Sequence, residues 1–169
     1  MNLRKILTGT AIVLVMVLGL TSCNKDKKRT ENFSYSFNTG QVAAAFAYSG
    51  THSSSLSADL KLEGQKDGTM ITVTLNNTVS GETYNIHAHD VADASTTPNG
   101  TPYNESPNTT VFVQQIMGNG GSANASQLTT MTVTELTETY EGFFVVHDPL
   151  QTLSTVDPTT YVLLASFAR

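Results

Sequence analysis

Hydrophobic and polar residues alternate over much of the chain after residue 33. Alternation with a period of two predicts strands that bury one face, because successive side chains of a strand point to opposite sides. Glycine, asparagine, aspartate and proline, which favour turns, stand between these runs. The alternation predicts about nine strands, within residues 33–37, 42–48, 56–62, 70–75, 84–88, 111–116, 131–133, 143–146 and 161–167.

Several short strands without a convincing amphipathic helix predict an all-β domain, a barrel or a sandwich of about eight or nine antiparallel strands. Two long connections interrupt the strands, residues 90–109 and 147–160, and together they contain all five prolines. Functional sites on β scaffolds tend to lie on long structured loops of this kind. The sequence shows no internal repeat and no second domain.

The N-terminus has the order of a secretory signal. Arg4 and Lys5 precede an apolar run over residues 6–20, which is short for a membrane-spanning helix. The run ends in Leu20-Thr21-Ser22-Cys23, which resembles the lipobox of bacterial lipoproteins. That resemblance implies cleavage before Cys23 and lipid on the new N-terminal cysteine. An ordinary signal peptide followed by an incidental cysteine is the alternative.

This organisation predicts a lipoprotein signal peptide over residues 1–22, a tether over 23–32 and a single β-domain over 33–169. The domain is long enough to bury its own core. Its predicted place is the bacterial cell envelope, where lipid on Cys23 anchors it to a membrane, on the periplasmic side or at the cell surface. The sequence does not identify a small-molecule or protein partner.

Acidic residues outnumber basic ones, 14 to 9. Four of the basic residues, Lys25, Lys27, Lys28 and Arg29, lie in the predicted tether. The predicted β-domain is therefore clearly acidic. This argues against nucleic acid as a partner, because affinity for nucleic acid comes largely from basic side chains that neutralise phosphates. Cys23 is the only cysteine, so the domain has no internal disulfide, and a metal site in it depends on nitrogen and oxygen donors with at most methionine sulfur.

Three of the four histidines have a pattern suited to metal binding. His87 and His89 stand two apart near the end of a predicted strand, so their side chains face the same side of the sheet. His147 ends another predicted strand, and both strands run into long connections. If the connections lie at one end of the barrel, the three imidazoles converge, and imidazole suits copper and zinc. Without convergence they are ordinary structural or surface residues.

The sequence around these histidines resembles copper–zinc superoxide dismutase. The run Gly81-Glu-Thr-Tyr-Asn-Ile-His-Ala-His-Asp90 is similar to the stretch that supplies two copper ligands in that family. The run Glu141-Gly-Phe-Phe-Val-Val-His-Asp148 is similar to the strand that leads to the family's last copper histidine. The resemblance covers roughly residues 56–169, and the histidine pattern also resembles chordin-type barrels. It implies a Greek-key, superoxide dismutase-like fold with copper held by His87, His89 and His147.

The chain departs from that family at positions that matter for activity. Tyr103 stands where the resemblance places a histidine that bridges copper and zinc, and no histidine occurs between His89 and His147. Tyr161 falls near the place of the family's active-site arginine. The resemblance therefore implies copper without zinc. It leaves two functions open: a copper-dependent oxidoreductase like superoxide dismutase, or a non-catalytic surface domain that keeps a relic of the metal site.

Five further residues are candidates for supporting roles. His52 is either a loop residue or a fourth ligand, if the first hairpin folds over the mouth of the barrel. Asp90 and Asp148 each follow a candidate ligand, where a carboxylate either accepts a hydrogen bond from the imidazole or caps a turn. Tyr103 and Tyr161 are either neighbours of the metal or plain core aromatics.

Overall fold

The structure is a computed structural model that describes residues 29–93, 97 and 100–169. The predicted signal peptide, the candidate lipidation site Cys23 and the tether up to residue 28 lie outside the described residues. The first strand begins at Thr30, inside the predicted tether. Among the described residues, none of the helices has the length and hydrophobicity needed to cross a membrane.

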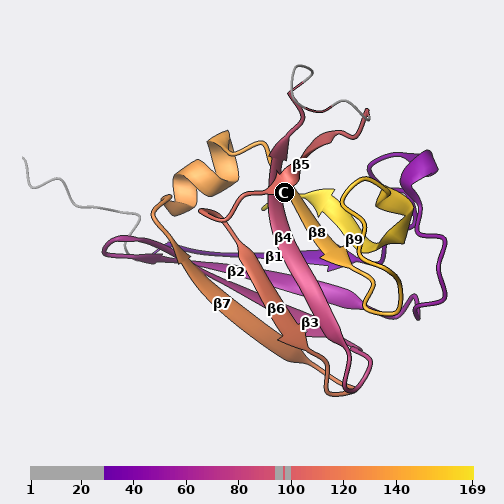
Figure 1. The fold of residues 1–169 in the computed structure, drawn as a ribbon. Helices are drawn as coiled ribbons and strands as arrows, with labels where there is room; N and C mark the ends of the chain where they lie inside the picture. The colour runs from indigo at the N-terminus through magenta and orange to yellow at the C-terminus, as the bar shows by residue number, and fades with distance from the viewer. Residues whose placement is uncertain (1–28, 94–96, 98–99) are drawn as a thin grey trace, which may run out of the picture.

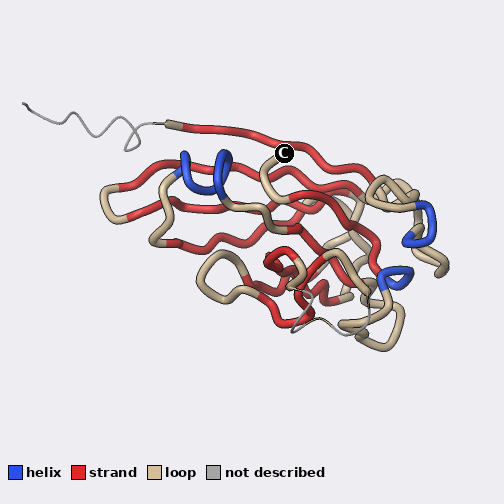
Figure 2. Tube along the Cα trace, turned by 90° about the horizontal axis from the view of Figure 1, so that it is seen from above, coloured by secondary structure: helices blue, strands red, loops and turns tan. Residues whose placement is uncertain are grey.

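In the described part of the chain, nine strands form two antiparallel sheets that pack against each other (Figures 1 and 2). The first sheet has the order β1-β2-β3-β7; in the second, β4 pairs with β5, β6 and β8, and β9 follows β8 at the edge. The sheets do not close on each other, so the domain is a sandwich, and the all-β prediction is confirmed. The strands are β1 (Thr30–Ser36), β2 (Ser57–Gln65), β3 (Gly68–Asn76), β4 (Thr83–Val91), β5 (Tyr103–Pro107), β6 (Val113–Met117), β7 (Ala123–Thr129), β8 (Phe143–His147) and β9 (Tyr161–Ser166).

The core lies between the sheets and follows from the alternation in the sequence. On the paired strands β2 and β3, Leu60 lies opposite Val73 and Leu62 opposite Ile71, and all four side chains are fully buried. Full burial of such a side chain contributes about 1.5–3 kcal/mol. The second sheet adds Tyr84, Ile86, Phe144 and Val146 to the same core.

After β3 the chain crosses from one sheet to the other three times. It leads from β3 to β4 in the second sheet, from β6 back to β7 in the first, and from β7 through the short helix η3 (Glu135–Thr139) to β8. β6 and β7 lie side by side where the two sheets adjoin (Figure 1). These crossings make β4 and β8, which carry the three candidate ligands, direct neighbours in the second sheet.

The predicted strand over residues 42–48 is wrong. This part of the β1–β2 connection contains a short 3-10 turn, η2 (Ala44–Phe46), and lies against the start of β9. Asn38 anchors it, because its side-chain amide donates to the carbonyl oxygens of Phe46 (2.8 Å) and Tyr161 (3.1 Å). The apolar side chains of the run therefore pack from a loop, not from a strand.

The predicted strand over residues 131–133 is wrong as well. Thr132 and Glu135 form a capping box: the Thr132 hydroxyl accepts from the Glu135 amide (3.1 Å), and the Glu135 carboxylate accepts from the Thr132 amide (2.7 Å). The pair satisfies two backbone donors that the start of a helix would otherwise leave free. The chain therefore enters η3 at this point.

Candidate metal centre

The alternation of β4 places two of the candidate ligands on the outer face of the second sheet. Tyr84, Ile86 and Ala88 point into the sandwich core, so His87 and His89 point away from it. His87 is partly exposed and His89 fully buried. The sequence alone predicts this shared face, and the structure shows which face it is.

His147 joins them from the neighbouring strand. β4 and β8 are antiparallel, with His87 opposite Val145, so His147 lies diagonally across from His87 on the same outer face. The ring centroids of His87 and His147 are 5.0 Å apart, and those of His87 and His89 are 5.6 Å apart. Because the strands are antiparallel, the connections that follow them leave from opposite ends of the sheet. The imidazoles therefore converge through strand register and not through two loops at one end.

The three side chains can hold a metal ion together. One nitrogen from each of His87, His89 and His147 lies within 4.8 Å of the other two. A shared ion with metal–nitrogen bonds of about 2 Å needs nitrogens within about 4 Å of one another. The rings therefore have to come closer together than they lie here before one ion bonds to all three.

Four of the six nitrogens of these rings are buried without a hydrogen-bond partner among the described residues. His87 Nδ1, His89 Nε2 and both ring nitrogens of His147 have no hydrogen-bond partner in the described part of the chain. Buried polar groups are nearly always paired, since leaving one unpaired costs about 1–3 kcal/mol. A shared cation accounts for three of these four atoms, because each neutral imidazole offers one lone pair to the ion and carries its proton on the other nitrogen. The second nitrogen of His147 is not accounted for in this way. The donor set therefore fits a metal ion.

The orientation of His89 is fixed by the backbone of β5. Its Nδ1 lies 2.8 Å from the carbonyl oxygen of Asn104, to which it donates. That bond leaves the lone pair on Nε2 free for an ion, the usual arrangement for a metal-bound histidine. Two extra residues of β5 lie between the register pairs at His89 and Val91, and Asn104 is within this irregularity. No side-chain pattern in the sequence marks Asn104, because it acts through its backbone oxygen.

The environment keeps the histidines uncharged. Burial, reinforced by the charge of His89, lowers the pKa of His87 to about 4. Burial, followed by the charges of His87 and His89, lowers the pKa of His147 to about 3, and burial also lowers the pKa of His89. All three rings are therefore neutral near pH 7, which is the form that binds metals.

Tyr103 and Tyr161 cover the buried side of the cluster. The ring centroids of Tyr161 and His147 are 4.6 Å apart, and those of Tyr103 and His89 are 5.3 Å apart. The centroids of the two tyrosine rings are 5.9 Å apart. Both are fully buried in a second apolar cluster with Val145 on the outer face of the sheet. They are thus neighbours of the candidate metal position.

The two tyrosines remain protonated at physiological pH. Burial raises the pKa of Tyr103 to about 12. Burial also raises the pKa of Tyr161, and the neighbouring Tyr103 raises it further. The wall beside the histidines is therefore aromatic and uncharged.

His52 lies apart from the cluster. Its Nε2 lies 2.7 Å from the Tyr84 hydroxyl, and its Nδ1 lies 3.0 Å from the Ser53 carbonyl oxygen. Its ring also stacks on Phe37, with centroids 6.4 Å apart. Both nitrogens are occupied by the protein, so the structure does not bring His52 to the other three.

The two aspartates that follow the candidate ligands bond to other groups. Asp148 accepts from the Tyr48 hydroxyl, the Leu150 amide (2.9 Å) and the Gln151 side chain (2.9 Å). Asp90 accepts from the Asn108 side chain at 2.7 Å. The bond to Leu150, two residues on, is the turn-capping role predicted for such an aspartate. Orientation of a ring by a protein acceptor comes from Asn104 instead.

Comparison with known proteins does not indicate a function for this chain, so the chemistry of the site is the guide. Neither the protein-family models nor the curated proteins searched match this chain. Three neutral imidazoles suit copper, zinc, iron and nickel alike. The donor set thus supports a transition metal without selecting one.

Proposed function

We propose that the domain binds one copper ion through His87, His89 and His147 as a superoxide dismutase-like module of the bacterial cell envelope, anchored by lipid on Cys23. The observation that carries the proposal is the convergence of three neutral imidazoles, each with a buried nitrogen that has no hydrogen-bond partner among the described residues. The lowered pKa values favour metal binding over a wide pH range, because no proton has to leave the imidazole before the metal binds.

The resemblance in sequence favours copper over other metals, and the donor set is compatible with it. The order of the sequence motifs resembles that of copper–zinc superoxide dismutase, and the residues of a zinc subsite are replaced, with Tyr103 in place of the bridging histidine. Three neutral imidazoles with no carboxylate among them also suit both oxidation states of copper. A bound copper ion would supply one-electron redox chemistry.

The charge distribution favours a copper-binding role over superoxide dismutation. The described residues include 13 acidic and only four basic side chains, and superoxide is an anion. A negative field repels an anion and lowers its rate of encounter. Tyr161, where the resemblance places an arginine, gives no compensating charge. We therefore propose a copper-holding domain whose dismutase activity is weak or absent.

Calorimetry with copper tests this proposal. The mature chain carrying Cys23→Ser is titrated with Cu(II), and with Cu(I) under a competing ligand, so that the thiol does not contribute. One ion should bind per chain, and the His87→Ala/His89→Ala double variant should lose most of the affinity. His52→Ala serves as a control because His52 lies outside the cluster. Equal copper binding by the parent and the double variant would contradict the proposal.

A further inference from the structure

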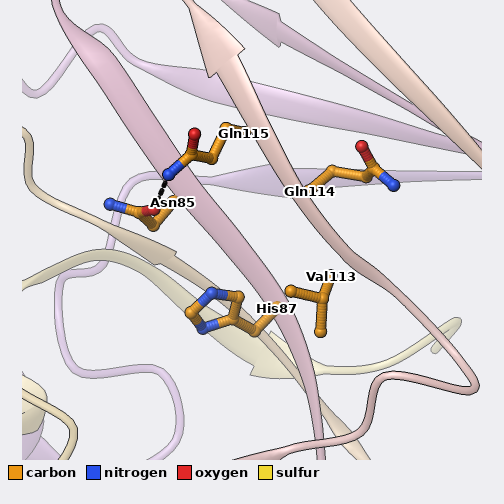
Figure 3. Close-up of a pocket in the computed structure, with 5 residues that line it drawn as sticks. All are labelled: Asn85, His87, Val113, Gln114 and Gln115. Carbon is orange, nitrogen blue, oxygen red and sulfur yellow. Dashed lines mark hydrogen bonds between the residues drawn. The ribbon is translucent and has the colours of Figure 1, made fainter.

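A hollow of about 400 Å³ opens on the outer face of the second sheet beside His87 (Figure 3). Its lining consists of His87, Val113 and three primary amides, Asn85, Gln114 and Gln115. These residues come from β4 and β6, which pair with His87 opposite Val113 and Asn85 opposite Gln115. The His87 hollow, as we call it, therefore has walls made of paired strands and not of loops.

This hollow lies on the accessible side of the histidine cluster. His87 is partly exposed, whereas His89 is 0% and His147 is 2% exposed. Tyr103 and Tyr161 cover the other two histidines. A small molecule that approaches the cluster from solvent therefore meets the edge of His87 first.

The polar groups of the hollow are neutral and partly free. Gln115 Nε2 donates to Asn85 Oδ1 at 2.8 Å, which leaves the amino group of Asn85 and the carbonyl oxygen of Gln115 without a hydrogen-bond partner among the described residues. Gln114 lies opposite the core residue Ile86, points away from Asn85 and His87, and donates to Gln127 Oε1 at 3.2 Å, so its side-chain amide does not face the hollow (Figure 3). The hollow thus offers one donor group, the amino group of Asn85, and one acceptor, the carbonyl oxygen of Gln115, on two side chains that hold each other in place.

No cation lines this hollow. The four basic residues that the structure describes lie elsewhere: Arg29 pairs with Glu31, Lys61 pairs with Glu63, Lys66 lies in the β2–β3 hairpin, and Arg169 donates to the Tyr140 carbonyl. An anion entering the hollow would lose hydration without gaining a counter-charge, which is unfavourable. A neutral molecule loses less and can pair with both kinds of free amide group.

We propose that the His87 hollow binds a small uncharged molecule that carries both hydrogen-bond donors and acceptors. That this molecule is the substrate or exogenous ligand of the metal centre rests on the proposed function. The hollow itself is formed by strand residues alone, so its selectivity can be measured with or without copper.

Formamide and formate make a matched pair of probes, since they have nearly the same size and shape but differ in charge. In the metal-free protein, the side-chain NH2 signals of Asn85 and Gln115 are followed by NMR during titration with each probe. We expect formamide to shift both signals and to bind several-fold more tightly than formate. Equal or tighter binding of formate, or no shift with formamide, would overturn the proposal.

A second measurement places the bound molecule relative to the metal. In the Cu(II)-loaded protein, the relaxation rate of the formyl proton of formamide should rise, and Val113→Trp, which fills the hollow, should abolish the rise. Met117→Trp is the matched control, because Met117 lies on the same strand, 70% exposed and outside the lining. If folded Val113→Trp showed the same rise in relaxation rate as the parent protein, the assignment of the hollow would be overturned. Failure of the parent protein to bind copper would instead overturn the proposed function, and the metal-free titration would still decide the hollow.

Discussion

Tyr161 lies against His147 because β9 contains one residue more than its partner strand. Val146 pairs with Leu163, and the next pair is His147 with Tyr161, so Val162 is a β-bulge. Val162 and Leu163 both point into the sandwich core as a result, and Tyr161 turns to the outer face. Without the bulge, Tyr161 would point into the core. The bulge at Val162 thus places Tyr161 in the aromatic wall that it forms with Tyr103 beside the candidate metal centre.

Shortening Tyr161 should destabilise the domain through lost packing. We expect Tyr161→Ala to lower the free energy of unfolding by about 3–5 kcal/mol, the usual cost of truncating a buried aromatic side chain. Tyr161→Phe keeps the ring and should change stability by less than about 1.5 kcal/mol. Urea denaturation of the metal-free proteins measures both. Equal stability of the Ala and Phe variants would show that the ring is not packed as described.

Replacing His147 by an apolar residue should stabilise the metal-free protein while it removes metal binding. Both ring nitrogens of His147 are buried without a partner among the described residues, so His147→Leu removes an unfavourable desolvation of about 1–3 kcal/mol. His52→Leu is the matched control, because both of its nitrogens are hydrogen-bonded and its removal should destabilise by a similar amount. His147→Leu should raise the melting temperature and remove copper binding, whereas His52→Leu should lower the melting temperature and leave copper binding intact. Thermal denaturation and copper titration measure these two outcomes.

The stability of the metal-free protein should depend on pH through the buried histidines. In the folded state the pKa of His87 is about 4 and that of His147 about 3, against an ordinary value of 6.5. Between pH 6.5 and pH 4 the unfolded chain therefore binds protons that the folded chain does not. The contribution of these histidines to stability should be constant above pH 7 and fall by a few kcal/mol as the pH drops through this window. The His147→Leu variant should lose less, and an equal loss would contradict the assignment.

Tyr48 should help to position the loop that follows His147. Its hydroxyl donates to the carboxylate of Asp148 and accepts from the His52 amide at 2.8 Å. We expect Tyr48→Phe to lower stability by about 1–3 kcal/mol, as for other hydrogen bonds to charged groups. It should also change the EPR parameters of a copper-loaded sample, because Asp148 adjoins a ligand. Unchanged spectra would limit Tyr48 to a role in stability.

Where burial creates a clear period of two, the sequence predicts the fold well. The alternation of β2, β3 and β4 is read directly from residues such as Leu60 and Val73 because one face of each strand is in the core. β7 has no such signal, since its partly buried residues that pack on the core are the small Ala123 and Ala125, and alanine is not favoured in strands. Local capping by Thr132 and Glu135 likewise overrides a short alternating run.

The candidate site is predictable only as far as side-chain chemistry marks it. His87 and His89 share a face by period alone, and His147 is added by its place at a strand end. Their convergence depends on the register of β4 against β8, which no local pattern specifies. Asn104 acts through a backbone oxygen, and the bulge at Val162 needs the pairing of β9 to be known.

The most direct test of a three-histidine copper centre is pulsed EPR on the Cu(II)-loaded protein with ¹⁵N-labelled histidine. The spectra should show three imidazole nitrogens bound to one copper ion. Each of His87→Ala, His89→Ala and His147→Ala should remove one of them, and His52→Ala should remove none. Copper that binds as tightly and with the same spectrum after all three substitutions are combined would contradict the account.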